Sequence, residues 1–427
     1  MKRDPLPDRA ADLGVLRFLT CGSVDDGKST LIGRLLFDTK ALLDDTLATL
    51  ERNAQRRGLS ALDLSLLTDG LVAEREQGIT IDVAYRYFAT ARRKFIIADS
   101  PGHVQYTRNM VTAASTADAA VLLVDARKGI LAQTRRHATI AGLVGVRHLI
   151  VAVNKMDQVD YAQGRFEEIV AEFRGWLERQ PTLHVRVDYL PLSALEGANV
   201  VDRDPRLAWF GGATLIELLE QAPAYQANAD APLRLPVQWV CRPAQSDFRG
   251  YAGRIESGRV ALGDELLVFP SGRTSRVTGL SLGTQALEQA GAGSSILLTL
   301  ADDLDISRGD LLAHTGAAAP LPCKAFDAKV CWLSARPLEP RREYLLRQAT
   351  RDTRVRVAAV RARLDVETLA WVGDEAAVQA NDIVRLRLST QQPIAGDPYE
   401  RFRSLGSFIL IDPATHDTVA AGMIEAA

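Results

Sequence analysis

Short apolar runs recur through the first half of the chain, and each is followed by residues with helical spacing. The runs at 15–19, 95–98 and 149–153 are continuous enough to be strands buried on both faces of a sheet. Apolar residues after the first run, at Leu31, Ile32, Leu35 and Leu36, repeat with the period of a helix face. This alternation predicts a mostly parallel α/β domain with helices on both faces of the sheet over residues 1–222.

The hydrophobic pattern changes beyond residue 222. Residues 223–232 contain Pro223 and Pro232 and little bulk, so we expect a linker there. Short alternating strands between glycine turns follow, for example at 233–237, 253–258, 264–269, 354–357 and 385–388. Many short strands at this spacing favour barrels. We therefore expect a first β-barrel over 233–320 and a second over 322–427.

The first apolar run leads directly into a phosphate-binding pattern. Residues 22–29 fit G-x-x-x-x-G-K-[ST] at every fixed position, between a predicted strand and a predicted helix. Such a loop aims several backbone N–H groups at one anion, and the helix N-terminus adds its positive end. Lys28 would reach the β- and γ-phosphates, and the Ser29 hydroxyl would bind Mg²⁺. The predicted loop residues are Gly22, Ser23, Val24, Asp25, Asp26, Gly27, Lys28, Ser29 and Thr30.

The run at 149–153 precedes a sequence that can read a guanine base. Asp157 can accept hydrogen bonds from the N1–H and the amine of guanine, a donor pair that adenine lacks. The stem of Lys155 can lie along the base, and Asn154 can brace the loop. The predicted base-binding residues are Asn154, Lys155, Met156 and Asp157, together with Ser193, Ala194 and Leu195, whose N–H groups suit the guanine O6. The chain is therefore expected to bind GTP.

Two further segments are placed to sense the third phosphate. Asp99 ends the run at 95–98, where a carboxylate can hold Mg²⁺ through water, and it is followed by Ser100, Pro101, Gly102 and His103. The Gly102 N–H can meet a γ-oxygen. Thr80 can give its hydroxyl to Mg²⁺ and its N–H to the γ-phosphate. Because hydrolysis would remove these contacts, both segments would relax and act as a GTP-driven switch.

His103, Thr80 and Lys28 are the candidate catalytic residues. His103 could orient the attacking water, while the alternative is an ordinary histidine on a surface loop.

Longer matches accompany these motifs and carry a family resemblance. They lie at 22–30, 69–88, 101–110, 125–129, 406–412 and 418–424. On these residues the chain resembles the GTPase subunit (subunit 1) of bacterial heterodimeric sulfate adenylyltransferase, itself a relative of the elongation factors that deliver aminoacyl-tRNA. The chain departs from these patterns at Ser23, where elongation factors usually have His, and at Val104, where sulfate-activating relatives often have Glu.

The resemblance implies a function. GTP hydrolysis would drive formation of adenylyl sulfate and diphosphate from ATP and sulfate on a small catalytic subunit, in a heterodimer or higher assembly. This chain lacks the Ser-Gly-Gly-x-Asp-Ser loop of that small subunit, and it lacks the second phosphate loop of a fused adenylylsulfate kinase. The alternative is a translation-type GTPase that binds an RNA-bearing ligand through its barrels.

Composition bears on nucleic-acid binding, on zinc sites and on the cellular compartment. A net charge of −2 over 427 residues gives no electrostatic footprint for nucleic acid. The four cysteines and six histidines show no zinc-ligand spacing, and a reducing cytosol fits unpaired cysteines. Cys21 beside the phosphate loop is interpreted as a packing residue, with redox sensing as the alternative. No run approaches the roughly 18 apolar residues of a membrane span, so we expect a soluble, cytoplasmic protein.

Arginines gather in one region of the second predicted barrel. They are Arg336, Arg341, Arg342, Arg347, Arg351, Arg354, Arg356, Arg361 and Arg363. Several alternate with apolar residues, which favours the solvated face of barrel strands. A docking surface for the partner subunit is the alternative, and nucleic-acid binding is disfavoured because no aromatic residues interleave as stacking platforms.

Overall fold

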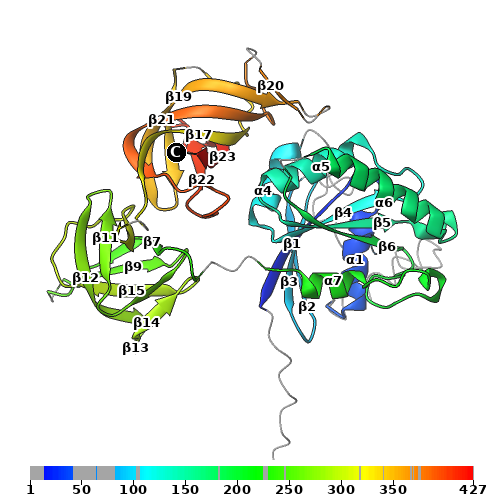
Figure 1. The fold of residues 1–427 in the computed structure, drawn as a ribbon, viewed down its shortest axis with the longest axis horizontal. Helices are drawn as coiled ribbons and strands as arrows, with labels where there is room; N and C mark the ends of the chain where they lie inside the picture. The colour runs from blue at the N-terminus through cyan, green and yellow to red at the C-terminus, as the bar shows by residue number, and fades with distance from the viewer. Residues whose placement is uncertain are drawn as a thin grey trace, which may run out of the picture. The chain divides into compact units, whose positions relative to one another are not determined.

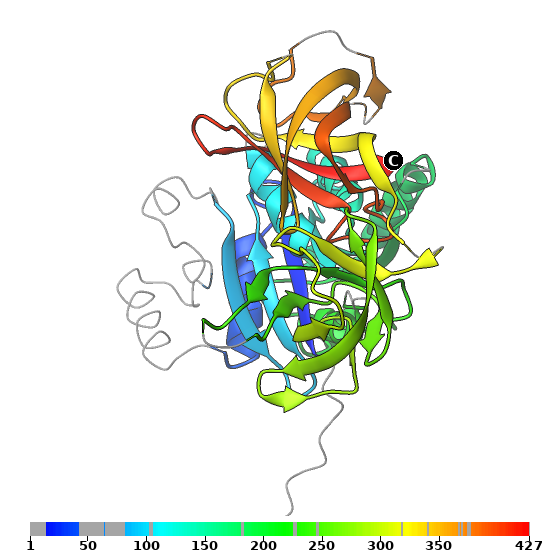
Figure 2. The same ribbon diagram turned by 90° about the vertical axis from the view of Figure 1, so that its left-hand side faces the viewer.

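The computed structural model describes residues 14–41, 64, 82–101, 106–180, 183–224, 229–244, 247–316, 319–339, 341–365, 368, 370–373 and 377–426. The chain divides into two compact units, residues 1–225 and residues 226–427 (Figures 1 and 2). Each unit is described by itself. Within the described residues, no helix combines the length and the apolar character needed to cross a membrane.

The first unit alternates strands and helices, as predicted. Its strands are β1 (Val15–Cys21), β2 (Ala84–Ala89), β3 (Lys94–Asp99), β4 (Ala119–Asp125), β5 (His148–Asn154) and β6 (Arg186–Pro191). Its helices are α1 (Lys28–Asp38), α4 (Thr107–Thr116), α5 (Ala132–Leu143), α6 (Gln163–Glu178) and α7 (Leu215–Gln221), with short 3-10 helices at η3 (Met156–Val159) and η4 (Pro205–Leu207).

These strands form one six-stranded sheet in the order β2-β3-β1-β4-β5-β6. Neighbouring strands are parallel except at one edge, where β2 runs antiparallel to β3. Every residue of β4 and β5 is buried, because helices cover both faces of the sheet. Edge strand β2 instead alternates, and it leaves Tyr85 and Tyr87 45% and 67% exposed. The predicted α/β fold is confirmed.

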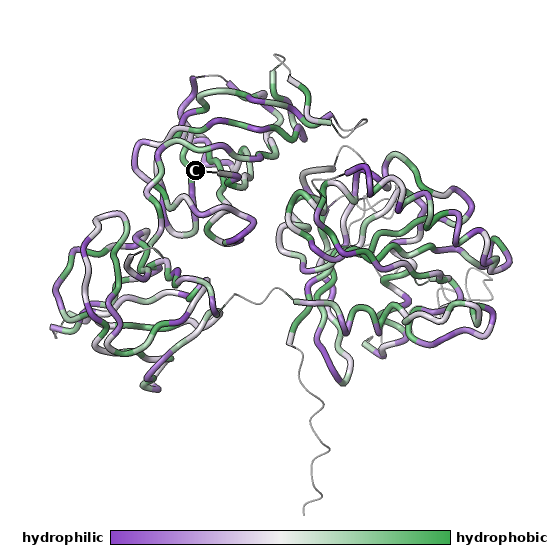
Figure 3. Tube along the Cα trace, viewed as in Figure 1, coloured by the Kyte–Doolittle hydropathy of each residue, from purple (hydrophilic) through white to green (hydrophobic). Residues whose placement is uncertain are grey.

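The core of the first unit follows the alternation of side chains along the strands. Phe18, Ile97 and Val121 point to one face of the sheet, where they pack in one cluster with residues of α1 and α7. Helices α4, α5 and α6 lie on the opposite face (Figure 1). Hydrophobic stretches run through the central strands in Figure 3, as expected for a sheet covered on both sides. The sheet therefore provides a rigid base for the loops at its edge.

The second unit consists of two β-barrels, which confirms the predicted fold class. The first contains β7 (Arg234–Pro236), β8 (Trp239–Cys241), β9 (Gly250–Arg254), β11 (Glu265–Phe269), β12 (Arg273–Leu282), β13 (Gln285–Ala286), β15 (Ser295–Leu300) and β16 (Leu311–His314), with β10 (Arg259–Ala261) and β14 (Gln289–Gly291) paired beside them. The second contains β17 (Pro322–Trp332), β18 (Glu343–Gln348), β19 (Arg351–Leu364), β20 (Trp371–Val372), β21 (Ile383–Ala395), β22 (Ser407–Ile411) and β23 (Thr418–Ala426). Strand β18 pairs with both β22 and β19, so the second barrel closes into a ring.

A buried ion pair joins the two barrels. Arg234 of β7 donates to Asp397 through two bonds, Nε to Oδ2 at 2.7 Å and Nη2 to Oδ1 at 3.0 Å. Both side chains are buried, and the guanidinium lies 4.8 Å from the centre of the Phe402 ring. Phe402 belongs to an apolar cluster that also contains Phe269 and Leu311 of the first barrel. The two barrels thus share a packed interface. The limits of the individual domains remain those predicted from the sequence.

The clustered arginines lie mainly on the outer surface of the second barrel. Arg354 and Arg356 of β19 are 69% and 68% exposed, and both pair with Glu343. Arg361 is 58% exposed and faces Asp327. These contacts support the interpretation of a solvated strand face whose charges are balanced within the barrel.

Removing Asp397 should destabilise the second unit strongly. Asp397→Ala would leave the Arg234 guanidinium buried without its carboxylate, a loss worth about 3–5 kcal/mol. Asp230→Ala is the matched control, because its pair with Arg259 is 87% and 61% exposed and is worth less than about 1 kcal/mol. Differential scanning calorimetry of the full chain measures both. Equal shifts of the unfolding transition would contradict a special role for the buried pair.

Candidate nucleotide-binding site

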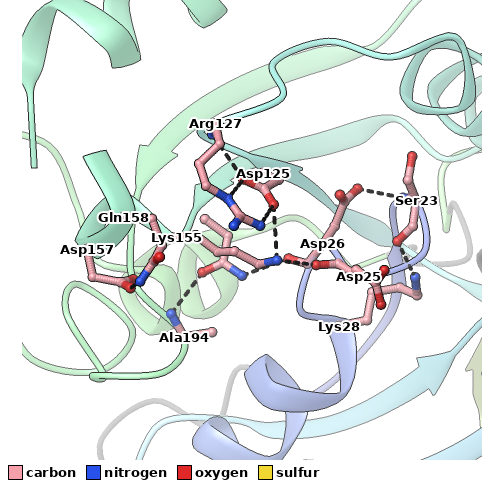
Figure 4. A network of polar contacts seen from close by, with 11 residues as sticks. Ser23, Asp25, Asp26, Lys28, Asp125, Arg127, Lys155, Asp157, Gln158 and Ala194 are labelled. Carbon is pink, nitrogen blue, oxygen red and sulfur yellow. Dashed lines mark hydrogen bonds and ion pairs between the residues drawn. The ribbon is translucent and has the colours of Figure 1, made fainter. Parts of the chain in front are cut away.

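The loops that follow the parallel strands gather at one end of the sheet, at the carboxyl ends of the strands. Parallel strands end on the same side, so residues after β1, β3, β4, β5 and β6 come together there. The register places Asp99 beside Thr20 and Asn154 beside Asp125. Figure 4 shows the resulting network of polar side chains. This end of the sheet brings together the described parts of every predicted site segment.

The loop between β1 and α1 has the backbone shape that the phosphate-binding pattern predicts. Gly27 has a φ of 92°, in the left-handed region, and α1 begins at the next residue. A Cβ at Gly27 would lie 2.4 Å from Nδ2 of Asn154, and one at Gly22 would lie 2.9 Å from the carbonyl oxygen of Leu123. The backbone thus approaches its neighbours too closely for any side chain at either position.

The ammonium group of Lys28 lies over its own loop. Nζ donates to the carbonyl oxygens of Gly22 at 3.0 Å and Ser23 at 2.9 Å, and the residue is 8% exposed. Burial lowers the pKa of Lys28, because it disfavours the charged form, while the carboxylates of Asp99 and Asp26 offset part of that effect. Because solvent stabilises this buried cation poorly, the negative charge of a bound phosphate would compensate it.

Asp26 closes the same loop from the inside. Its Oδ2 accepts the Ser23 N–H at 2.6 Å, and the residue is 1% exposed. Burial raises the pKa of the Asp26 carboxyl, although the bond from Ser23 favours the ionised form. Within the described residues, Oδ1 of Asp26 and the Ser23 hydroxyl have no hydrogen-bond partner. The Ser23 hydroxyl is therefore a buried donor that a bound anion could use.

Asn154 connects the phosphate loop to the loop after β6. Its Nδ2 donates to the carbonyl oxygen of Asp26 at 2.8 Å, and its Oδ1 accepts the Ala194 N–H at 2.9 Å. The residue is 2% exposed. One buried amide therefore fixes the distance between the two halves of the site, as expected for a bracing residue.

Asp157 is held in a fixed orientation. Oδ1 accepts the Ser193 hydroxyl at 2.6 Å, and Oδ2 accepts Nε2 of Gln158 at 2.7 Å. An ionised carboxylate has about four lone-pair sites, so each oxygen can accept a further bond from a base. Met156, which precedes Asp157, is fully buried, and its N–H donates to the carbonyl oxygen of Leu192 at 3.3 Å.

Lys155 spans from one loop to the next with its backbone in the left-handed region, at a φ of 62°. Nζ pairs with Oδ2 of Asp125 at 3.0 Å and donates to the carbonyl oxygen of Asp25. Arg127 also donates to both oxygens of Asp125, at 3.0 and 2.6 Å. Although burial raises the pKa of Asp125, the bonds from Arg127 and Lys155 hold it well below its ordinary value. Figure 4 shows both basic side chains directed at this carboxylate.

Asp125 and Arg127 were not among the predicted site residues. The signal for Asp125 was present, because it ends the apolar stretch of β4 just as Asp99 ends that of β3. Arg127 had no comparable signal, since its contact depends on the turn after β4.

The end of β3 is tied to β1. Asp99 is 2% exposed and its Oδ1 accepts the Thr20 hydroxyl at 3.3 Å, while the Ser100 hydroxyl donates to the carbonyl oxygen of Thr20 at 2.8 Å. Ser29 and Thr30 lie half-buried in the first turn of α1, and Pro101 is buried. Thr80, Gly102, His103 and Val104 lie outside the described residues. Within the described part of the chain, no three His, Cys, Asp or Glu side chains gather as metal ligands.

Cys21 behaves as a packing residue. The residue is fully buried, and burial raises the pKa of its thiol to about 12. A thiol that stays protonated is a poor nucleophile and a poor redox sensor. All four cysteines are unpaired.

A side chain at Gly27 should damage nucleotide binding. Gly27→Ala forces the Cβ against Asn154 and strains the backbone, so the loop must shift and GDP affinity should fall by about 10- to 100-fold, the equivalent of 1–3 kcal/mol of strain. Gly263→Ala is the control, because Gly263 has a similar φ of 85° with open space around it. Titration with a fluorescent GDP analogue measures both variants. Unchanged affinity in Gly27→Ala would show that the close approach to Asn154 is unimportant.

Comparison with known proteins gives matches over nearly the whole chain. Residues 14–227 match the family described as "Elongation factor Tu GTP binding domain". Residues 325–425 match the family described as "GTP-eEF1A C-terminal domain-like". The first match coincides with the unit that carries the polar network.

Individual relatives are similar along their length. "Sulfate adenylyltransferase subunit 1" of Aeromonas hydrophila is 51% identical over 414 residues, covering 96% of this chain and 86% of the relative. The protein of the same name from Bacteroides thetaiotaomicron is 46% identical, covering 98% and 87%. "Bifunctional enzyme CysN/CysC" of Mycobacterium tuberculosis is 49% identical, covering 96% and 67%. The chain therefore belongs to the sulfate adenylyltransferase subunit 1 family, and its first unit carries a GTP-binding domain of the elongation factor Tu type.

Proposed function

We propose that this chain is the GTP-hydrolysing subunit of a sulfate adenylyltransferase. In the proposed reaction, ATP and sulfate give adenylyl sulfate and diphosphate on a separate small catalytic subunit, and GTP hydrolysis on this chain supplies the driving force. The observation that carries the proposal is the 51% identity to a subunit 1 over 96% of the chain. The name of that relative also supports a partner subunit, which we expect in a heterodimer or larger assembly.

Guanine would be read at the loops that follow β5 and β6. The Asp157 carboxylate, held by Ser193 at 2.6 Å, would accept the N1–H and the amine of the base. Adenine has no matching donor pair and would leave the carboxylate poorly compensated. The Lys155 stem, fixed at its far end by Asp125, would lie along the base.

The phosphates would lie at the N-terminus of α1. The N–H groups of the loop would bind the β- and γ-phosphates. Lys28 would bind them too, because its buried ammonium group already lies at this loop. The Ser29 hydroxyl and the Asp99 carboxylate are of the chemical type that holds Mg²⁺, Asp99 through water, with Thr80 as a further ligand. When bound, Mg²⁺ would offset charge on the phosphate oxygens. The Gly102 N–H and Thr80 would contact the γ-phosphate only before hydrolysis.

Coupling to the partner would depend on those two contacts. His103 would orient the water that attacks the γ-phosphate. Loss of that phosphate would release the segments around Thr80 and Gly102, and the partner subunit would respond because it binds the two states differently. We also propose a cytoplasmic location, supported by the four unpaired cysteines.

Replacing Asp157 should change the preferred base. Asp157→Asn should lower GTP affinity by about 10- to 100-fold, because hydrogen bonds to a charged group contribute roughly 1.5–3 kcal/mol. The same variant should favour xanthosine triphosphate, whose carbonyl can meet the Asn amide where guanine has its amine. Asp160→Asn, at an exposed position three residues later, is the matched control. A variant that keeps the wild-type preference for GTP would remove Asp157 from this role.

Hydrolysis should respond to the partner and should drive synthesis. The chain alone should hydrolyse GTP slowly, and the rate of hydrolysis should rise when the small subunit, ATP and sulfate are all present. His103→Ala should retain GTP affinity and slow hydrolysis by about 100-fold or more, as expected for loss of a positioned base or water-orienting group, whereas Lys28→Ala should weaken binding itself. Thr80→Ala should lower GTP-stimulated adenylyl sulfate formation even where nucleotide binds.

The measurement is the rate of adenylyl sulfate and of GDP formation on the same sample. If adenylyl sulfate formation stays at the wild-type rate while GDP formation collapses, hydrolysis does not drive synthesis and the proposed function fails. A preparation that carries tRNA and supports no synthesis with any small subunit would favour the translation-type alternative.

A further inference from the structure

Arg34 reaches from helix α1 to the loop after β6. Its Nε donates to the carbonyl oxygen of Ala194 at 3.3 Å, and its Nη2 donates to that of Leu195 at 2.5 Å. Its Nη1 pairs with Asp38, one turn further along α1, at 3.4 Å. The side chain is 19% exposed. Two of these three contacts therefore fix backbone of the loop that the proposed function assigns to guanine.

The neighbouring backbone N–H groups of this loop already have acceptors. The Ser193 N–H donates to the carbonyl oxygen of Ala198 at 3.1 Å, and the Ala194 N–H donates to Asn154 at 2.9 Å. The Glu196 N–H donates to the Ser193 hydroxyl at 3.2 Å. Among the described residues, the Leu195 N–H has no acceptor, so it is the backbone donor of this loop that stays available for a ligand.

The direction of that donor follows from the planar peptide bond. In a trans peptide the carbonyl of one residue and the N–H of the next point in opposite directions. Because Arg34 draws the Ala194 carbonyl toward α1, the Leu195 N–H points away from α1. The Ser193 hydroxyl, bonded to Asp157 at 2.6 Å, keeps this loop beside the carboxylate that would read the base.

The far side of the loop is held by a second group of side chains. The Tyr161 hydroxyl donates to the Glu196 carboxylate at 2.7 Å, and Arg206 pairs with the same carboxylate. The Arg206 guanidinium also lies 4.4 Å from the centre of the Tyr161 ring. With Glu196 fixed on one side, the carbonyls of Ala194 and Leu195 are the groups whose direction depends on Arg34.

We propose that Arg34 is a positioning residue for guanine recognition. By holding the carbonyls of Ala194 and Leu195, it aims the Leu195 N–H at the position of the guanine O6. The inference rests on the proposed function and adds to it a residue whose contacts are with the loop backbone and Asp38. Because Arg34 lies on the helix that begins with Lys28, it also links the phosphate-binding and base-binding halves of the site.

The test separates O6 recognition from the rest of the base. Three nucleotides are titrated against the full chain: GDP, 6-thio-GDP, in which sulfur replaces O6 and is a weaker acceptor, and inosine diphosphate, which lacks the amine read by Asp157. The variants are Arg34→Gln, Arg34→Lys and Asp38→Asn. Asp38→Asn is the matched control because it removes the ion pair and leaves both carbonyl contacts of Arg34. Thermal unfolding of each variant establishes that it is folded.

Arg34→Gln should lower the preference for GDP over 6-thio-GDP by about 3- to 10-fold, the size of one net hydrogen bond. Its preference for GDP over inosine diphosphate should stay within about twofold of wild type, because Asp157 is untouched. Arg34→Lys should lie between wild type and Arg34→Gln, and Asp38→Asn should match wild type.

Equal loss of affinity for all three nucleotides, or no change in the GDP to 6-thio-GDP ratio, would overturn the positioning role. The inference rests on the guanine-binding part of the proposed function, and ADP tests that part: if guanine is not recognised here, the wild-type chain will not distinguish GDP from ADP. Failure of the link to adenylyl sulfate synthesis is seen separately, in the rates of adenylyl sulfate and GDP formation.

Discussion

The buried amide of Asn154 is the interaction on which the candidate site depends. Its donor holds Asp26 in the phosphate loop, and its acceptor holds Ala194 in the loop after β6. Both partners are backbone groups, so the side chain fixes the shape of two loops at once. A buried amide that is satisfied on both sides allows little movement, since shifting either loop would leave a polar group unpaired. The separation of the two loops is therefore set by the chain itself.

The two lysines of the site differ in how their charges are compensated. Asp125 receives Lys155 and Arg127 together, and so orients a lysine whose own backbone is in an unusual conformation. Lys28 is satisfied by neutral carbonyl oxygens of its own loop, and burial weakens its hold on the proton. The first arrangement fixes a side chain in place, whereas the second leaves a cation ready for an anionic ligand. The two lysines therefore have different electrostatic tasks.

Much of the architecture could be predicted from local sequence patterns. The apolar runs predicted β1, β3 and β5, and the glycines and Lys28 predicted the loop at the start of α1, because periodicity and motif spacing report on neighbouring residues. Asp125 could have been predicted as a site residue, because it ends an apolar stretch, but Arg34 could not, for a physical reason. Arg34 meets a loop 160 residues away, and such a contact depends on how helices pack against the sheet. The domain limits and the roles of Thr80, Gly102 and His103 stay predictions.

The closed ring of the second barrel has a consequence for association. Strands β18, β22, β23, β17, β21 and β19 each have a neighbour on both sides along part of their length, so none of the six has a fully free edge. Edge pairing with another molecule is therefore confined to the short stretches outside these ladders. A protein that recognises the paired stretches of the ring must read their side chains, among them the exposed arginines of β19. Affinity at such a surface can be tuned one substitution at a time, without disturbing strand register.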